Sequence, residues 1–270
     1  MYLNYWNLTR RPFDDGAATD FYVPVESHQS SLLKLRYVVE QRKGLALIAS
    51  EHGFGKTYLT QVLESELKSE TNATFLRLVF PQLSPSGMLA YLARRMGVAV
   101  PHSNTDADVL EAIEDRFEEL KDEGIHVVVV VDDAHLLEVP HLQTLRLLLN
   151  LRENGTGDFS MILCGRTELL SRVQQVAALD QRVAVRTTIT SMSPDDVLTY
   201  AEHRLSVAGA MSPIFNAESA QAVWEISQGI PRRVNQICDL ALLVAYVDQQ
   251  RTIAAVDVEA AAEELISVAA

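Results

Sequence analysis

The feature that most restricts the fold of this sequence is a run of five consecutive valines, Val127–Val131. β-Branched residues favour strands, and a strand without polar alternation is apolar on both of its faces. Such strands occur in the centre of parallel sheets, where helices cover both faces. The run is far too short to span a bilayer, which needs about 20 helical residues. We therefore expect an α/β fold with this strand at its centre.

Similar short runs recur along the first two-thirds of the chain and alternate with amphipathic stretches. This alternation is typical of a parallel sheet whose strands are joined by helices. The predicted strands are Leu45–Ala49, Thr74–Phe80, His126–Val131, Phe159–Cys164 and Ala184–Ile189. The helices predicted between them are Lys56–Leu67, Ser84–Met96, Asp106–Leu120 and Leu142–Leu151.

The strand pattern stops after Ser191, and only helical patterns follow, separated by short breaks that contain Gly, Pro or polar residues. These helices are Pro194–Ala208, Ala217–Ser227, Pro231–Val247 and Val256–Val268. We therefore expect a domain boundary near Thr190–Ser193. It separates a sheet domain at residues 1–190 from a helical domain at residues 191–270.

The charge balance limits the partners that the chain can bind. Lys and Arg number 23 against 36 Asp and Glu, which gives a formal net charge of −13. This balance disfavours a protein that coats nucleic acid or an anionic membrane, although it is compatible with a local basic patch. The two cysteines lie in apolar segments, and the N-terminal segment lacks the pattern of a secretory signal. We expect a soluble cytoplasmic protein without a membrane span.

A candidate phosphate loop, Ser50-Glu-His-Gly-Phe-Gly-Lys-Thr57, lies between a predicted strand and a predicted helix. It matches the template Gly-x4-Gly-Lys-[Ser/Thr], except that Ser50 replaces the first glycine. Gly53 and Gly55 let the backbone N–H groups turn toward phosphates, Lys56 can reach the β- and γ-phosphates, and Thr57 can ligate Mg²⁺. The alternative is a strand–helix turn with a solvated lysine. The expected nucleotide-binding residues are Ser50, Glu51, His52, Gly53, Phe54, Gly55, Lys56, Thr57 and Tyr58.

Two acids follow the valine run directly. Ligands gather at the carboxyl ends of parallel strands, so we expect Asp132 to hold Mg²⁺ and Asp133 to orient the attacking water. Asp133 is one methylene shorter than the Glu found at this place in many ATPases, which favours slow hydrolysis. The alternative is a pair of solvated acids at a strand end. We interpret His135 as structural, since no second metal ligand stands at a helical spacing.

Arginines near the γ-phosphate would complete such a site. Arg182 and Arg186 precede and enter the last predicted strand, and Arg232 opens a helix just after Pro231, a residue suited to a first helical turn. The alternative for each arginine is a surface ion pair with one of the many acids.

Together these segments resemble the AAA+ ATPases of the ExeA type, found in general secretion pathways, and the related TniB/TnsC-type transposition ATPases. The resemblance covers nearly the whole chain. The segments that carry it are Tyr5–Leu8, Arg11–Phe13, Ser27–Leu32, Pro81–Ser84, the phosphate loop, Leu163–Leu169, Gln181–Val183, Ala201–Leu205 and Gly229–Asn235.

The resemblance implies a P-loop NTPase (AAA+) fold, with a parallel five-stranded sheet domain followed by a small all-helical lid, and the cofactors ATP or ADP and Mg²⁺. It implies that Lys56 and Thr57 belong to Walker A, and Asp132 and Asp133 to Walker B. It places Arg182 in the arginine-finger region, Arg232 at the sensor-2 position and Phe13 near the adenine. Three positions depart from the family pattern, namely Ser50, Asp133 and Arg166, the last standing where glutamine is usual at sensor 1.

The function we expect is that of a homo-oligomeric ATPase, in a ring or filament, that acts as a nucleotide-dependent switch and remodels or recruits a protein partner. A second hypothesis is a DNA-associated regulator of transposition, suggested by the pairs Arg94-Arg95 and Arg42-Lys43 but disfavoured by the net charge. A third, suggested by Asp133, is a nucleotide-binding module with little turnover.

Overall fold

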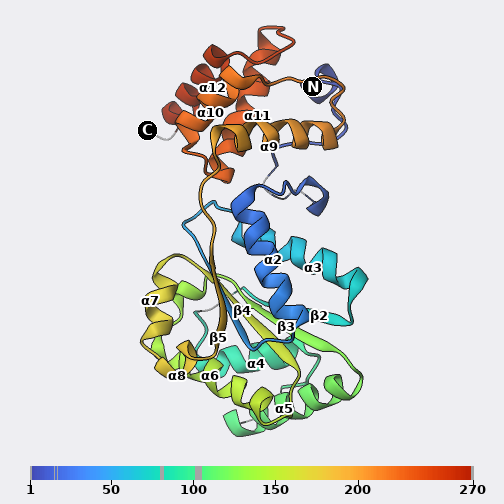
Figure 1. Cartoon of the computed structure of the whole chain (residues 1–270), viewed down its shortest axis with the longest axis vertical. Helices are drawn as coiled ribbons and strands as arrows, with labels where there is room; N and C mark the ends of the chain where they lie inside the picture. The colour runs from blue at the N-terminus through green and yellow to red at the C-terminus, as the bar shows by residue number, and fades with distance from the viewer. Residues whose placement is uncertain (1, 15, 17, 80–81, 101–104, 269–270) are drawn as a thin grey trace. The chain divides into compact units, whose positions relative to one another are not determined.

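The computed structural model describes residues 2–14, 16, 18–79, 82–100 and 105–268. The chain forms two compact units, which we call the sheet unit and the helical unit (Figure 1). The sheet unit comprises Ser30–His52 and Lys56–Ile189, and the helical unit comprises Met1–Gln29, Gly53–Gly55 and Thr190–Ala270. The sequence pattern predicts a sheet domain at residues 1–190, whereas the structure groups the first 29 residues and three residues of the phosphate loop with the helices.

The sheet has five strands, all parallel, in the order β2-β3-β4-β1-β5. The register pairs Ala49 with Gly165 and Val131 with Leu163, so the segments after β1 and β3 leave the sheet at the same edge. Phe80, the last residue of the predicted second strand, and Pro81 lie outside the described residues. The strands are β1 (Leu45–Ala49), β2 (Ala73–Leu78), β3 (His126–Val131), β4 (Phe159–Gly165) and β5 (Val183–Thr188).

Helices or short 3-10 turns join the strands and build the second unit. The α-helices are α1 (Tyr2–Tyr5), α2 (Glu26–Glu40), α3 (Lys56–Glu70), α4 (Pro85–Arg95), α5 (Asp106–Asp122), α6 (Val139–Glu153), α7 (Glu168–Gln174), α8 (Ala177–Asp180), α9 (Pro194–Ala208), α10 (Ala217–Ser227), α11 (Pro231–Val247) and α12 (Ala255–Val268). The 3-10 turns are η1 (Thr19–Phe21) and η2 (Ala134–Leu136). α6 begins three residues before its predicted start, because Pro140 fits a first helical turn and the Glu138 N–H donates to His141 Nδ1 at 3.3 Å.

The centre of the sheet is buried on both faces. Every residue of β1, β3 and β4 is buried, as the uninterrupted valine run predicts. One face packs on α5, where the rings of Phe117 and Phe159 stack with centroids 4.5 Å apart. Full burial of a valine contributes about 1.5–3 kcal/mol, so these strands supply much of the stability of the unit.

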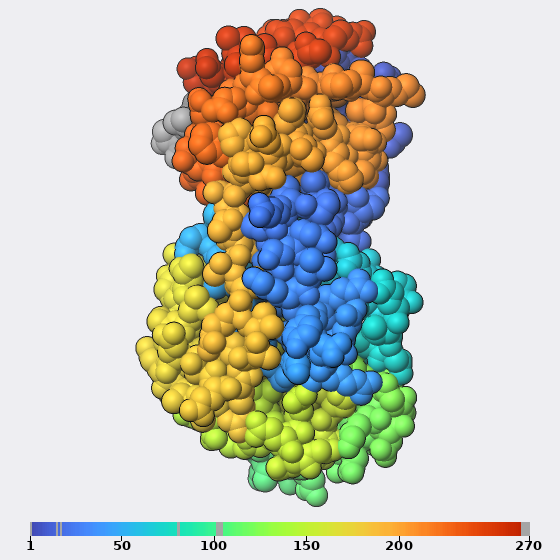
Figure 2. Space-filling model, in the orientation of Figure 1, coloured from blue at the N-terminus to red at the C-terminus, as the bar shows by residue number. Residues whose placement is uncertain are grey.

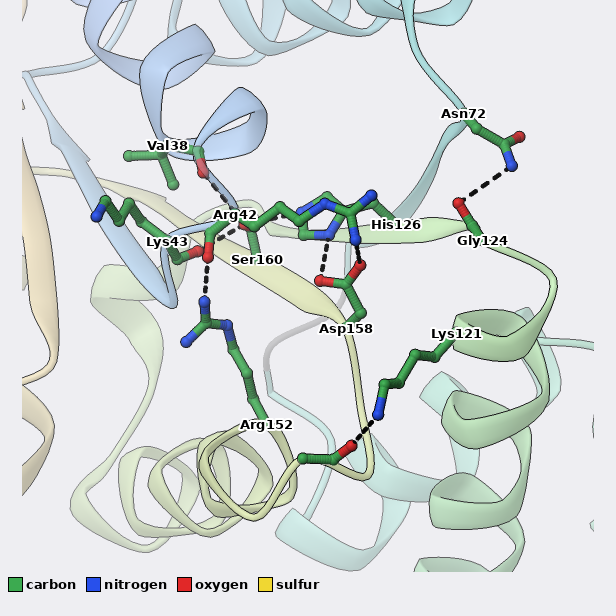
Figure 3. Close-up of polar contacts among 11 residues, drawn as sticks. Val38, Arg42, Lys43, Asn72, Lys121, Gly124, His126, Arg152, Asp158 and Ser160 are labelled. Atoms are coloured by element: carbon green, nitrogen blue, oxygen red, sulfur yellow. Dashed lines mark hydrogen bonds and ion pairs between the residues drawn. The ribbon is translucent and has the colours of Figure 1, made fainter.

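A polar cluster ties together the starts of three strands, at the edge of the sheet opposite to the phosphate loop (Figure 3). His126, the first residue of β3, lies with Nδ1 2.9 Å from Asp158 Oδ1 and Nε2 3.0 Å from Ser160 Oγ. The Ser160 hydroxyl also lies 2.6 Å from the carbonyl oxygen of Lys43, and Arg42 pairs with Asp158. Ser160 has no exposed surface, so we interpret this Ser–His–Asp set as structural and not as a hydrolytic triad.

The helical unit packs α9–α12 around an apolar core that includes the start of the chain, shown in dark blue beside these helices (Figures 1 and 2). Trp6, Phe13 and Phe21 are buried in this core, and the Trp6 indole N–H donates to the Leu242 carbonyl at 3.1 Å. The buried Arg204 donates from Nε to the Pro12 carbonyl at 2.5 Å. These contacts explain why the first residues group with the helices.

Among the described residues, no helix combines the length and the apolar character that crossing a membrane requires.

Candidate functional site

The phosphate loop takes its shape from two glycines between β1 and α3. Gly53 and Gly55 have φ angles of +82° and +83°, in the left-handed region that favours glycine. Ser50 has no positive φ, so the serine at the template's first glycine position adopts ordinary backbone geometry. Its N–H donates to the Gly165 carbonyl at 3.1 Å, which ties the start of the loop to the end of β4.

Lys56, at the start of α3, directs its ammonium group back onto the loop. The Nζ donates to the carbonyl oxygens of Ser50 at 2.6 Å and Glu51 at 2.9 Å. Burial lowers the pKa of Lys56, and the neighbouring acids Asp133, Glu51 and Asp132 oppose this shift. The ammonium group is therefore held inside the loop by carbonyl oxygens that compete only weakly with a phosphate for a cation.

The two predicted metal ligands lie together. Asp132 directly follows β3 and is 7% exposed, and the Thr57 hydroxyl donates to its Oδ1 at 3.2 Å. Burial raises the pKa of Asp132, while the hydrogen bond from Thr57 lowers it. A hydroxyl and a buried carboxylate at the end of a phosphate loop are the oxygen donors that Mg²⁺ uses together with phosphate oxygens. The residues present therefore fit the expected ion.

Asp133 differs from Asp132 in both exposure and backbone. Its side chain is 55% exposed, and its φ of +48° lies in the left-handed region, which is uncommon for a residue with a side chain. His135 Nδ1 lies 3.9 Å from the Asp133 carboxylate and, within the described part of the chain, is buried without a hydrogen-bond partner. Burial lowers the pKa of His135, which favours a neutral imidazole.

A further pairing, at the loop residue Glu51, was not predictable from the sequence. Glu51 accepts a hydrogen bond from the Thr167 hydroxyl at 2.6 Å and from Arg166 Nε at 3.2 Å. These two donors lower the pKa of Glu51. Arg166 and Thr167 directly follow β4, the strand next to β1. The only signal in the sequence was the unusual arginine at position 166, and nothing there indicated its partner.

Arg182 does not reach the loop in this chain. Its guanidinium forms two hydrogen bonds with Glu153, at 2.6 and 2.7 Å, and one with Asn150 at 3.0 Å. Both partners belong to α6. Arg186 pairs instead with Asp180 at 2.6 Å. The structure thus gives both arginines partners within their own unit.

In the helical unit, the middle of the phosphate loop is held by two donors. The Arg232 backbone N–H donates to the Gly53 carbonyl at 3.1 Å, and His28 Nε2 lies 2.9 Å from the Phe54 carbonyl oxygen. A Cβ on Gly53 would approach the Arg232 and Ile230 side chains to 3.1 Å, so glycine is needed there for space as well as for its φ. The Arg232 side chain is exposed at the start of α11.

The start of α11 is positioned by a tight turn at Gly229. The Gly229 carbonyl accepts from the Met192 N–H at 2.9 Å, and the Met192 carbonyl accepts from the Trp224 indole at 2.9 Å. A Cβ on Gly229 would lie 2.2 Å from the Met192 oxygen. No side chain fits in this contact, which sets the path of the chain into Pro231 and Arg232.

The other predicted nucleotide-binding residues are more dispersed. Phe13 is 4% exposed, and its ring packs edge-on against Phe215 at 6.2 Å, in the core of the helical unit. His52 is exposed with its ring 6.2 Å from that of His135, and Tyr58 lies half-buried in the first turn of α3. Phe13 therefore supports the segment around it from inside the core.

Comparison with known proteins shows the family of the chain. A family model described as an AAA domain matches residues 39–173, half of the chain. The chain is 30% identical over 270 residues to general secretion pathway protein A of Aeromonas hydrophila, covering 99% of this chain and 49% of that protein. The chain thus spans about half the length of this relative.

Solved structures share the fold. The Aeropyrum pernix ORC2 protein in its ADPNP–ADP complexes has a TM-score of 0.73 and 17% identity, over 94% of this chain and 71% of that chain. Cdc6p from Pyrobaculum aerophilum has a TM-score of 0.75 and 17% identity, over 94% of this chain and 70% of that chain. The RuvB Holliday junction branch migration motor of Thermotoga maritima has a TM-score of 0.61 and 18% identity, over 89% of this chain and 69% of that chain. Identities this low show the fold alone.

Proposed function

We propose that this chain, which belongs to the AAA domain family, is an ATP-binding switch that hydrolyses ATP and remodels or recruits a protein partner. Its fold is the P-loop NTPase (AAA+) fold predicted from the sequence, and its resemblance to the ExeA type is confirmed by the 30% identity to general secretion pathway protein A. The observation that carries the proposal is the 3.2 Å contact between Thr57, the last residue of the phosphate loop, and the buried Asp132.

Different residues of the site bind the phosphates, the Mg²⁺ ion and the adenine. The loop amides and Lys56 bind the phosphates, which draw the ammonium group from the Ser50 and Glu51 carbonyls that hold it now. Thr57 and Asp132 hold Mg²⁺, which supplies charge neutralisation for the phosphates and for the buried carboxylate. We assign the adenine side to the segment around Phe13, and sensor 2 to Arg232.

Hydrolysis is the weaker part of the activity. Asp133 orients the attacking water, but its carboxylate is one methylene shorter than that of glutamate, so turnover is slow. Arg182 serves a neighbouring subunit as an arginine finger in a ring or filament. It acts only after it leaves Glu153, since both guanidinium edges are bonded within α6 and α8 in this chain. The assembled state is therefore the active one.

We place this activity in the cytoplasm, where the two cysteines, both buried free thiols, remain reduced.

The DNA-associated alternative has less support. Arg42, one of the basic residues that suggested it, pairs with Asp158 in the polar cluster. Arg94 and Arg95 remain exposed at the end of α4, in a chain of net charge −13. Two exposed arginines release few counterions, so any duplex binding should disappear as salt rises.

The test combines binding, turnover and size. Affinity for a fluorescent ADP analogue is measured with and without Mg²⁺, and ATP turnover is measured against protein concentration. We expect Lys56→Ala to abolish both, and Lys68→Ala to change neither, because Lys68 pairs with Glu64 at the far end of α3. The specific ATPase activity should rise with protein concentration. The molar mass measured by light scattering in the presence of ATP should rise over the same concentrations.

Nucleotide binding that survives Lys56→Ala would contradict the assignment of the loop. Specific activity independent of concentration would contradict the oligomeric switch and the role of Arg182. Duplex DNA binding that depends on ATP and persists at physiological salt would favour the DNA-associated alternative.

A further inference from the structure

His28 is a buried imidazole directed at the phosphate loop. It lies in the first turn of α2, is 7% exposed, and has Nε2 2.9 Å from the Phe54 carbonyl oxygen. A carbonyl oxygen only accepts hydrogen bonds, so Nε2 must carry the proton. Burial lowers the pKa of His28, which favours the neutral ring with Nδ1 unprotonated. The Ser27 hydroxyl, 3.4 Å from Nδ1, donates to the Thr190 carbonyl at 3.1 Å.

The bond to Phe54 fixes a peptide plane. In a trans peptide the C=O and the following N–H point in opposite directions, so a carbonyl drawn toward His28 turns the Gly55 N–H away from it. The neighbouring peptide is held in the same manner, since the Gly53 carbonyl accepts from the Arg232 N–H at 3.1 Å and the Phe54 N–H turns away. The Gly53 and Phe54 carbonyls are thus both bonded to other residues of the helical unit.

The two amides that these bonds turn away are donors suited to an anion. In the described part of the chain, no backbone acceptor is bonded to the Phe54 or Gly55 N–H. Consecutive N–H groups with a glycine of positive φ form a concave nest that binds phosphate oxygens. The positive φ angles of Gly53 and Gly55 complete this geometry.

We propose that His28 is a positioning residue for phosphate binding: its Nε2–H holds the Phe54 carbonyl so that the Gly55 N–H is preorganised for a nucleotide phosphate. The inference rests on the nucleotide binding proposed above and assigns a role to a residue far from the loop in sequence. Without the imidazole, the peptide is free to rotate, and the bound nucleotide must order it. The free energy spent on ordering this peptide weakens the binding of phosphate-bearing ligands.

The test compares two substitutions at one position. His28→Leu keeps the volume but removes the donor, whereas the side-chain amide of His28→Gln places an N–H at a similar reach. Dissociation constants for Mg·ADP are measured by displacement of a fluorescent nucleotide. We expect His28→Leu to weaken binding about tenfold, the typical effect of leaving one carbonyl unbonded. His28→Gln should remain within about threefold of the unaltered chain.

His203→Leu is the matched control. It removes a partly buried imidazole of the same unit whose Nε2 has no hydrogen-bond partner among the described residues. The affinity of this variant for Mg·ADP should be unchanged. Circular dichroism and thermal melting verify that every variant is folded.

Nitrogen NMR of the unaltered chain reports the tautomer of His28 in the absence of nucleotide. We expect the Nε2–H form and a pKa below 6.5, the ordinary value for histidine.

The outcomes separate this proposal from the proposed function. If the unaltered chain binds no nucleotide, the proposed function fails and the role of His28 with it. If Lys56→Ala abolishes binding while His28→Leu leaves it unchanged, only the present proposal is overturned. Equal loss in His28→Leu and His28→Gln, or an Nδ1–H tautomer in the NMR experiment, also overturns it.

Discussion

The substitution Gly229→Ala should destabilise the helical unit more than the same substitution at a turn glycine that is required only for its positive φ. The added Cβ would lie 2.2 Å from the Met192 oxygen and 2.9 Å from the Met192 nitrogen, and both are backbone atoms that no side-chain rotation can move. The φ of +66° adds the strain of a left-handed residue with a side chain. The segment at Met192 and the start of α11 must therefore separate.

The magnitude follows from three costs. The left-handed conformation costs about 1–2 kcal/mol, and backbone displacement of the overpacking kind costs about 1–3 kcal/mol. The hydrogen bond from the Met192 N–H to the Gly229 carbonyl contributes about 0.5–1.5 kcal/mol, which is lost when the segments separate. We expect the free energy of unfolding of the helical unit to fall by about 3–6 kcal/mol, a large part of the about 5–15 kcal/mol by which domains are stable.

The assay is urea unfolding followed by tryptophan fluorescence. The chain has two tryptophans, Trp6 and Trp224, and both belong to the helical unit, so the signal reports on that unit. Gly209→Ala is the control, because Gly209 also has a positive φ, +111°, but a Cβ there meets no atom closer than 3.3 Å. If the two variants lose equal stability, the contact with Met192 is not what requires glycine, and the reasoning fails.

Three further predictions concern the site and the polar cluster. Asp132→Asn should remove the Mg²⁺ dependence of nucleotide binding while the chain stays folded; a Mg²⁺ titration monitored by nucleotide affinity would contradict this if the variant still responded. Asp133→Glu should raise ATP turnover severalfold by extending the carboxylate toward the water, and unchanged steady-state turnover would argue against that role. Burial lowers the pKa of His126 in the folded chain, so the unfolded chain takes up a proton first and stability should fall as pH decreases through about 6.5. The fall, measured by urea unfolding at several pH values, should be smaller in His126→Gln; an equal fall in both proteins would locate the effect at other groups.

Local patterns were sufficient to predict the sheet. The run Val127–Val131 predicted a strand covered on both faces, and every residue of that strand is buried. The glycines of the phosphate loop occupy left-handed conformations, which glycine adopts more readily than other residues. The contact between Thr57 and Asp132 was predictable as well, since the ends of parallel strands meet at one edge.

Long-range pairings were beyond the sequence. Trp6 and Phe13 are apolar residues in a segment without clear periodicity, and only the assembled core shows that they pack with α9–α12. The partners of Arg182 and Glu51 lie 29 and 115 residues away in the chain, and in a sequence rich in charges no spacing rule selects one partner over another. His28 lies in a segment that carries the family resemblance, but the sequence did not indicate its role, which depends on one carbonyl of a distant loop.

The packing of the first 29 residues with α9–α12 has a consequence for biosynthesis. Trp6 and Phe13 are synthesised about 180 residues before Thr190, where the rest of their core begins. At about 5–20 residues per second, these side chains wait about 9–36 s without their partners. The sheet residues between Ser30 and Ile189, apart from the glycine turn, are complete by then and can fold first. A nascent chain stalled before α9 should therefore present an aromatic segment to chaperones while its sheet is already formed.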